Sequence, residues 1–190
     1  PYTSDGGETV AWVVEQGEDL HWLGPPLRLT DRVDRWLAGS DGTRADLSGR
    51  GIDVAAVAPE FVETPEVGAD VAARCRRAAG VADDGMLVVG AGIATRRKAP
   101  DLFVEVALAH GRDRTRPPAT FVWLGGERDP LFDRLRVEVD RLGLRGVRFA
   151  GDVVDVAPWL AAADVLLHPA RLDAFPLVCV TAAALGTPVV

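Results

Sequence analysis

Short apolar runs alternate with helical patterns through the second half of the chain, and this alternation constrains the fold more than any other feature of the sequence. Polar and apolar residues mostly do not alternate within these runs, which is typical of strands that are covered on both faces. Between them, residues such as Leu102, Val106 and Ala109 recur at the spacing of one helix face. Strand–helix repeats of this kind predict an α/β fold, a Rossmann-like parallel sheet with helices on both faces. The expected strands are residues 86–89, 120–124, 147–150, 165–168 and 188–190, and the expected helices are 100–110, 130–142, 156–163 and 176–185.

The first sixty residues show the same alternation less clearly. Strands are expected at 9–14 and 53–57 and a helix at 41–47, whereas residues 30–37 fit neither period. This part therefore predicts a fragment of a second Rossmann-like domain.

Two prolines, Pro59 and Pro65, mark a hinge between domains. We place residues 1–59 in a remnant of an N-terminal domain with its linker, and residues 60–190 in a C-terminal domain. The chain begins with a proline and ends inside an expected strand. We therefore expect a segment of a longer protein, with the C-terminal domain truncated at its end.

The charge balance and the cysteines bear on what the chain binds and where it works. Its formal net charge is −7 at pH 7, from 21 basic and 28 acidic side chains, which speaks against general nucleic-acid binding. Cys75 and Cys179 fit no metal-ligand or redox spacing, so we expect no metal site and a reducing, cytoplasmic location. We also expect no transmembrane segment, because prolines break the longest uncharged stretch, residues 174–190.

The loops that leave the expected strands are the candidate binding segments, because ligands of open parallel sheets bind beyond the carboxyl ends of the strands. The first loop, residues 90–98, carries glycines and ends in Arg96, Arg97 and Lys98, the only lysine of the chain. A compact ammonium on a flexible stem suits a diphosphate. The alternative is a solvated basic turn. Thr95 stands at the third glycine position of G-x-G-x-x-G, so the loop is not a dinucleotide fingerprint.

The second loop begins with Gly125 and Gly126 and runs to Pro130. Paired glycines after a strand let a ligand approach the backbone closely. The alternative is a tight turn into a helix that begins at Pro130.

The third loop leads from the strand at 165–168 into a helix whose first turn presents backbone N–H groups and the positive end of its dipole. Such a helix end suits an anion. Asp173, just before the helix, either caps it or accepts hydrogen bonds from a polyol. Thr181, two turns further on, is either a ligand contact or part of the core.

Four segments together resemble one known family. The segments are Arg97-Lys98-Ala99, Gly125-Gly126-Glu127, Asp173-Ala174-Phe175-Pro176-Leu177 and residues 181–190. In that order, they are similar to the Arg-Lys-Gly, the Gly-rich loop, the acidic-x-Phe-Pro-Leu segment and the Glu-Ala-x-Ala-x-Gly-x-Pro-Val-Val ending of the group 1 (family four) retaining glycosyltransferases. The GT-B architecture of that family sets two Rossmann-like domains across a cleft. The resemblance covers most of the chain and is strongest from Met86 onward.

The resemblance implies that residues 60–190 bind a nucleotide diphosphate sugar and that residues 1–59 belong to the acceptor side. The assigned residues are Arg97, Lys98, Phe175, Pro176 and Leu177 for the donor diphosphate, Asp173 and Ala174 for the donor sugar, and Gly125, Gly126, Val153 and Thr181 for the nucleoside.

The chain departs from the family's pattern at four positions. Thr181 stands where the family has a glutamate that binds the ribose hydroxyls, and Gly92 where many members have a second phosphate-binding arginine. Asp173 is shorter than the usual glutamate, and Ala99 replaces a glycine. Arg97 and Lys98 would grip the donor diphosphate, and we call them the clamp. The four changes imply that this clamp is only partial.

The implied function is hexosyl transfer from a nucleotide diphosphate sugar to an acceptor, with retention of the anomeric configuration. The clamp would stabilise the leaving diphosphate electrostatically, without a cofactor or metal. The acceptor, whether glycan, lipid or small molecule, is not identified, and peripheral membrane association of the full protein stays open. None of His21, His110 and His168 has a catalytic spacing, so no general base is assigned. We expect the isolated segment to be inactive, because the acceptor groups lie in the largely missing domain.

Two other functions remain open at this stage. A degenerate, non-catalytic module that binds nucleotide sugars is favoured by Thr181 and Gly92. A Rossmann-type NAD-dependent oxidoreductase is disfavoured by the failed dinucleotide fingerprint.

Overall fold

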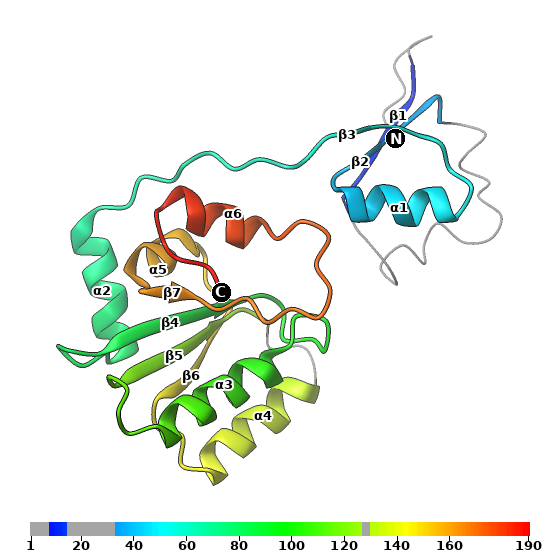
Figure 1. The fold of residues 1–190 in the computed structure, drawn as a ribbon. Coiled ribbons are helices and arrows are strands. Elements are labelled where there is room, and N and C mark those ends of the chain that lie inside the picture. Colours follow the sequence, from blue (N-terminus) through cyan, green and yellow to red (C-terminus); the bar gives the residue numbers. More distant parts are fainter. Residues whose placement is uncertain (1–7, 15–32, 127–129) are drawn as a thin grey trace. The chain divides into compact units, whose positions relative to one another are not determined.

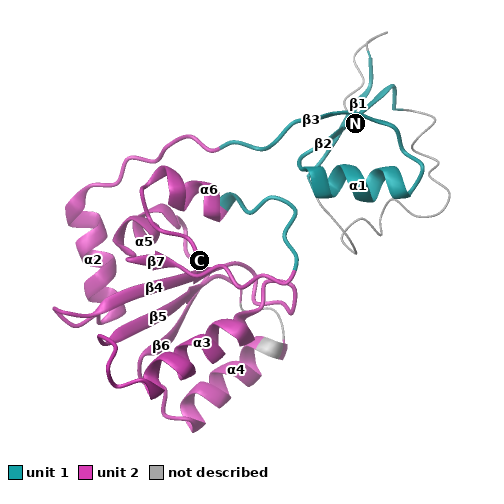
Figure 2. Cartoon of the chain, viewed as in Figure 1, with its two compact units in different colours: residues 1–61, 172–177 teal, residues 62–171, 178–190 magenta. Residues whose placement is uncertain are grey.

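The structure of the chain, a computed structural model, describes residues 8–14, 33–126 and 130–190. The chain forms two compact units (Figure 2). The first consists of Pro1–Phe61 with Leu172–Leu177, and the second of Val62–Arg171 with Val178–Val190. Over the described residues, the helices are all too short or too polar to cross a membrane.

The first unit contains a small parallel sheet with one helix. Helix α1 begins after Ser40, whose side chain accepts a hydrogen bond from the Thr43 N–H at 3.0 Å and so caps the helix. The sheet has the order β1-β2-β3, and its buried side chains pack against α1. The elements are β1 (Val10–Val13), β2 (Arg35–Ala38), α1 (Asp41–Gly49) and β3 (Val54–Val57).

The second unit is a four-stranded parallel sheet in the order β6-β5-β4-β7, with helices between consecutive strands (Figure 1). The strands are β4 (Met86–Ala91), β5 (Ala119–Leu124), β6 (Val147–Gly151) and β7 (Val165–Leu166), and the helices are α2 (Ala69–Ala79), α3 (Pro100–Arg112), α4 (Pro130–Arg141), α5 (Ala157–Ala162) and α6 (Leu177–Ala184).

Successive residues of β4 point to opposite faces of this sheet, and both faces are covered. Val88 packs with side chains of α3 and α4 in one buried cluster, where Phe103 of α3 meets the rings of Phe121 and Trp123 edge-on. Leu87 and Val89 belong to the other cluster, with side chains of α2, α5 and α6. Figure 1 shows the two groups of helices on either side of the strands. The prediction of a parallel sheet with helices on both faces is confirmed.

Two expected strands are shorter in the structure. β7 ends at Leu166, and Val189 forms an isolated bridge with Leu166 in place of a strand over 188–190. Single backbone hydrogen bonds continue beyond it, from the Leu167 N–H to the Val89 carbonyl and from the His168 N–H to the Val190 carbonyl. Pro169 and Pro188 flank these pairings, and proline has no N–H with which to extend a ladder.

The strand order determines where a ligand can bind. β4 and β7 are neighbours, yet α3, which follows β4, and α6, which follows β7, cover opposite faces of the sheet. The loops that leave β4 and β7 therefore diverge, and a crevice at such a topological switch point is the usual ligand site of open α/β sheets.

Candidate functional site

The loop from β4 to α3 holds the predicted clamp residues at this edge of the sheet. Turns within the loop fold it back, with the Thr95 N–H donating to the Ile93 carbonyl at 2.7 Å. Arg97 and Lys98 are half-buried. The loop begins at Gly92, because Gly90 and Ala91 lie in β4, which corrects the expected loop 90–98.

The stem of Lys98 lies against Gly92. A Cβ atom added at Gly92 would come within 3.2 Å of Lys98 Cγ, and Gly92 has φ +143°, a conformation that side chains rarely adopt. The lysine stem therefore uses the space that a side chain at position 92 would need. The glycine at position 92, where many members of the resembled family have an arginine, thus leaves room for the Lys98 stem.

Ala99 closes the loop in a left-handed conformation. Its φ is +57°, and among the described residues it alone has a positive φ without being glycine. It is fully buried and precedes Pro100, the first residue of α3. The backbone therefore keeps the shape that suits the glycine of the resembled family, although a methyl group is present.

The loop after β5 packs directly on the loop after β4. A Cβ at Gly125 would lie 2.9 Å from the Gly92 carbonyl oxygen, and one at Gly126 would lie 2.7 Å from Ile93 Cα. The Gly126 N–H donates to Asp152 Oδ1 at 2.7 Å, so the loop after β6 joins the same group. Both glycines thus have a packing role, and their contact with a nucleoside stays a prediction. Residues 127–129 of this loop lie outside the described residues.

Arg171 ties the loop after β7 to the loop after β4. Its backbone N–H donates to the Arg97 carbonyl at 2.8 Å, and its Nη1 donates to the Arg96 carbonyl at 3.0 Å. Its guanidinium also forms a fork with both carboxylate oxygens of Asp101, at 2.8 and 2.6 Å. The Arg171 hydrogen bonds hold the pKa of Asp101 below its ordinary value. Sequence reasoning gave neither residue a role, because 70 positions separate them.

The remaining predicted residues lie after β6, before α6 or within α6. Val153 follows β6 and packs against the cluster of α2, α5 and α6, whereas the next side chain, Val154, is exposed. The segment 173–176 leads to Leu177, the first residue of α6, and Thr181 lies within that helix. The assignment of all these residues to a donor stays a prediction.

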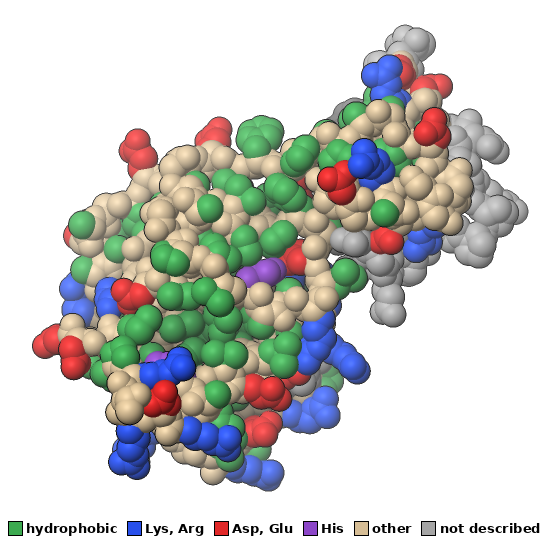
Figure 3. All heavy atoms as spheres, in the orientation of Figure 1, with side chains coloured by type: hydrophobic (Ala, Val, Ile, Leu, Met, Phe, Trp, Pro, Cys, Tyr) green, Lys and Arg blue, Asp and Glu red, His purple; other side chains and the backbone are tan. Residues whose placement is uncertain are grey.

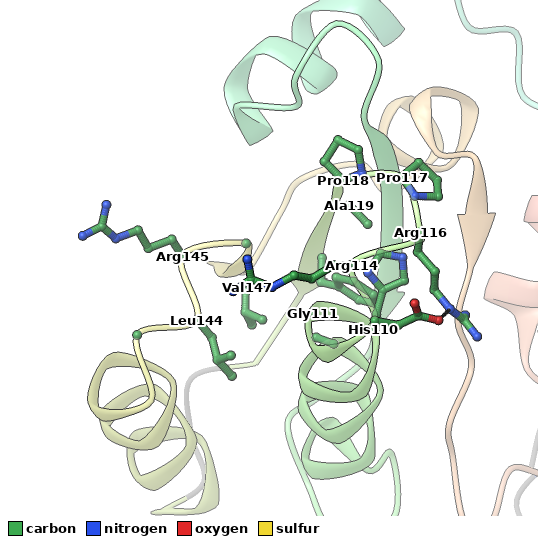
Figure 4. Close-up of a pocket in the computed structure, with 15 residues that line it drawn as sticks. His110, Gly111, Arg114, Arg116, Pro117, Pro118, Ala119, Leu144, Arg145 and Val147 are labelled. Carbon is green, nitrogen blue, oxygen red and sulfur yellow. Dashed lines mark hydrogen bonds and ion pairs between the residues drawn. The ribbon is translucent and has the colours of Figure 1, made fainter.

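A cavity of about 590 Å³ lies at the opposite end of the sheet, beside the first residues of β5 and β6. In Figure 4, Arg145 points away from the other labelled side chains, and Arg116 pairs with Asp113 at 2.9 Å. His110 packs edge-on against Phe121 there, with ring centroids 5.7 Å apart. None of the predicted site residues lines this cavity. The candidate site is therefore the other end of the sheet, where the strands have their carboxyl ends, and we call this end the carboxyl edge.

On the face in Figure 3, Arg and Lys side chains are interspersed with Asp and Glu, and hydrophobic atoms gather between them. Over residues 8–14, 33–126 and 130–190, no group of three His, Cys, Asp or Glu side chains is arranged to hold a metal ion.

A family model described as "Glycosyl transferases group 1" matches residues 83–190. This region begins just before β4 and includes every loop of the carboxyl edge described above. The chain belongs to the group 1 glycosyl transferases. The predicted family is thereby confirmed.

Curated relatives of this group 1 chain carry one name. A D-inositol 3-phosphate glycosyltransferase of Jonesia denitrificans is 32% identical over 160 residues, which cover 81% of this chain and 36% of the relative. The protein of the same name from Xylanimonas cellulosilytica is 34% identical over 155 residues, 76% of this chain and 36% of the relative. The chain thus spans about a third of the length of these relatives.

Solved structures share the fold of the group 1 chain. The structure of Anabaena HepE in complex with UDP and glucose has a TM-score of 0.79 at 20% identity, over 96% of this chain and 52% of that one. WaaG, a glycosyltransferase involved in lipopolysaccharide biosynthesis, has a TM-score of 0.71 at 21% identity, over 96% of this chain and 56% of that one. These likenesses confirm the Rossmann-like α/β fold of GT-B glycosyltransferases.

Proposed function

We propose that the chain is the donor-binding part of a glycosyltransferase that moves a sugar from a nucleoside diphosphate sugar to an acceptor, with retention of the anomeric configuration. The observation that supports this most is the setting of Lys98. It is half-buried, its stem lies against Gly92, and its loop leaves the sheet at the switch point between β4 and β7.

Lys98 and Arg97 would act on the leaving group. As the anomeric bond breaks towards an oxocarbenium-like state, negative charge grows on the departing diphosphate. Fixed cations and the N–H groups at the start of α6 would stabilise that charge, and they need no reorganisation at the moment of reaction. We propose that this electrostatic clamp works without a metal ion. Asp173 would hold hydroxyls of the donor sugar.

The donor and the acceptor follow from the relatives as proposals. HepE was solved with UDP, with UDP-glucose, and with UDP and glucose, so a uridine diphosphate sugar is the first donor to test. The curated relatives are named for D-inositol 3-phosphate, so a phosphorylated polyol is the first acceptor class to test. Because the chain spans about a third of those relatives, we expect it to bind the donor without transferring the sugar.

A thermal-shift panel of UDP, GDP, ADP and their sugars tests this function. Binding to the folded state at 100 times Kd adds about 2.7 kcal/mol to the unfolding free energy, which raises the Tm of a chain of this size by roughly 5–10 °C. Lys98→Ala removes a charge-assisted contact and should weaken diphosphate binding about 10- to 100-fold.

Arg116→Ala is the matched control for Lys98→Ala. It also removes one cation, but at the opposite end of the sheet, beside Asp113. The control variant should respond to nucleotides like the unchanged chain. A nucleotide response that Lys98→Ala leaves intact would refute the assignment of the clamp.

A second function, binding without transfer, is favoured by Gly92. A second phosphate-binding cation at that position would compete with the Lys98 stem for space. A full-length protein that binds the donor, yet transfers sugar to no phosphorylated polyol, would support this second function. Membership of a transferase family argues against the oxidoreductase alternative.

A further inference from the structure

The ion pair between Arg171 and Asp101 spans the switch point of the sheet. Arg171 follows β7 and Asp101 lies in the first turn of α3, after β4. Both terminal nitrogens of Arg171 are used, one by Asp101 and the Arg96 carbonyl and the other by Asp101 alone. The backbone N–H of Arg171 adds a bond to the Arg97 carbonyl. Two of these four hydrogen bonds hold backbone carbonyls of the loop that carries Arg97 and Lys98, and the other two hold the Asp101 side chain at the start of α3.

The carboxylate of Asp101 is in an unexpected place for a site that binds an anion. It follows Lys98 by three residues, so their Cα atoms lie at most about 11 Å apart. Taken only as a charge, it would repel a diphosphate and weaken binding. A carboxylate in the first turn of α3 is favoured by the positive end of the helix dipole, and the fork with Arg171 gives this carboxylate a further contact.

We propose that Arg171 and Asp101 are positioning residues that hold Arg97 and Lys98 in the shape that grips the donor diphosphate. This inference rests on the proposed donor-binding function. The pair acts through the loop backbone, since the carbonyls of Arg96 and Arg97 are the groups that Arg171 holds. Its side chains are 36% and 31% exposed, and partly exposed pairs of this kind add little to global stability.

Asp101→Asn separates positioning from simple electrostatics. Removing a negative charge near an anion site should tighten binding if charge alone matters. If Asp101 positions the loop, the same change should weaken UDP binding about tenfold. This is the lower end of the loss of affinity seen when a residue that orients a metal ligand is replaced. Arg171→Lys keeps the charge but cannot form the fork, and it should weaken UDP binding similarly.

Calorimetric titration with UDP and with uridine makes the test. We expect both single variants to lose UDP affinity, the double variant to lose no more than either single one, and uridine binding to stay unchanged. Asp113→Asn is the matched control, because it breaks another aspartate–arginine pair at the far end of the sheet. It should leave both affinities unchanged, and circular dichroism should show that each variant is folded.

The outcomes distinguish this inference from the proposed function. If the unchanged chain binds no UDP, GDP or ADP, the proposed function fails and this inference fails with it. If the unchanged chain binds UDP and Asp101→Asn binds it equally or more tightly, the positioning role is overturned while donor binding stands. Equal losses of UDP and uridine affinity would also overturn the positioning role, because the effect would not be specific to phosphate.

Discussion

At the scale of single residues, Gly90 shows how packing selects a glycine. A Cβ atom at this position would lie 2.7 Å from the rings of both Phe103 and Trp123. These rings are almost completely buried and meet edge-on, with centroids 5.4 Å apart. The glycine therefore lets α3 approach β4 closely below the candidate site.

Gly90→Ala should destabilise the chain by about 1–3 kcal/mol, the usual effect of overpacking a close-packed core. Urea unfolding followed by circular dichroism measures this loss. The matched control is Gly111→Ala near the end of α3, where an added Cβ meets nothing within 4 Å. That change should be neutral or stabilising by up to about 1 kcal/mol, because alanine favours helices. Equal effects of the two changes would contradict the packing argument.

The sequence analysis placed Gly90 in the expected loop 90–98, whereas it lies in β4. A strand followed by Gly-Ala-Gly suggests a flexible loop, and only the meeting of α3 with β5 shows that position 90 lies in a packed strand. The same limit applies to Ala99, since an alanine gives no local signal of a left-handed backbone. Lys98 was recognisable because it is the only lysine in an arginine-rich chain.

At the scale of elements, a partly exposed polar network joins α2, β4 and the start of β7. Arg76 of α2 donates to the Ala162 carbonyl at 2.9 Å and to the Gly85 carbonyl at 2.8 Å. It also pairs at 2.8 Å with Asp164, which accepts the Leu87 N–H at 2.7 Å. Partial burial alone would raise the pKa of Asp164, but the hydrogen bonds from Arg76 and Leu87 outweigh it and hold the pKa below its ordinary value.

The lowered pKa of Asp164 predicts a loss of stability in acid. A group whose pKa is lower in the folded state stabilises the fold above its unfolded pKa, and this contribution disappears as the pH falls through the folded value. The free energy of unfolding should therefore fall between about pH 5 and pH 2, and fall less steeply in Asp164→Asn. At pH 7, Asp164→Asn should lose up to about 1 kcal/mol, because the pair is partly exposed.

Urea unfolding at a series of pH values measures this effect. Asp84→Asn is the control, since Asp84 is an exposed residue of the turn before β4. It should keep the acid dependence of the unchanged chain. An equally steep acid loss in Asp164→Asn would show that Asp164 does not contribute as described.

Most elements could be predicted from the sequence because their apolar residues recur at a clear period. α3 covers the expected 100–110 and continues to Arg112, and β5 differs from the expected 120–124 by one residue. β2 overlaps residues 30–37, whose hydrophobic period did not distinguish a strand from a helix. The strand is only four residues long and begins with a charged residue, so it gives too short a pattern. Its pairing with β1 and β3 fixes it as a strand, which is a tertiary effect.

At the scale of the whole molecule, the region that matches the family lies mainly in the second unit, and the strand order of that unit positions the candidate site. The sequence could name the three loops, since glycines and cations follow the expected strands. It could not show which loops touch. Arg171 and Asp101 are far apart in the chain, and the contact of Gly126 with Ile93 depends on how β4 and β5 pair.

The proposed function requires that the carboxyl edge of β4–β7 binds a nucleoside diphosphate. Amide chemical-shift mapping of the ¹⁵N-labelled chain during titration with UDP is the sharpest test, because it locates the bound ligand residue by residue. We predict that the largest changes fall on residues 92–98, Gly125, Gly126 and the start of α6. Changes confined to residues 110–118 and 143–147, which line the cavity at the opposite end of the sheet, would contradict binding at the carboxyl edge.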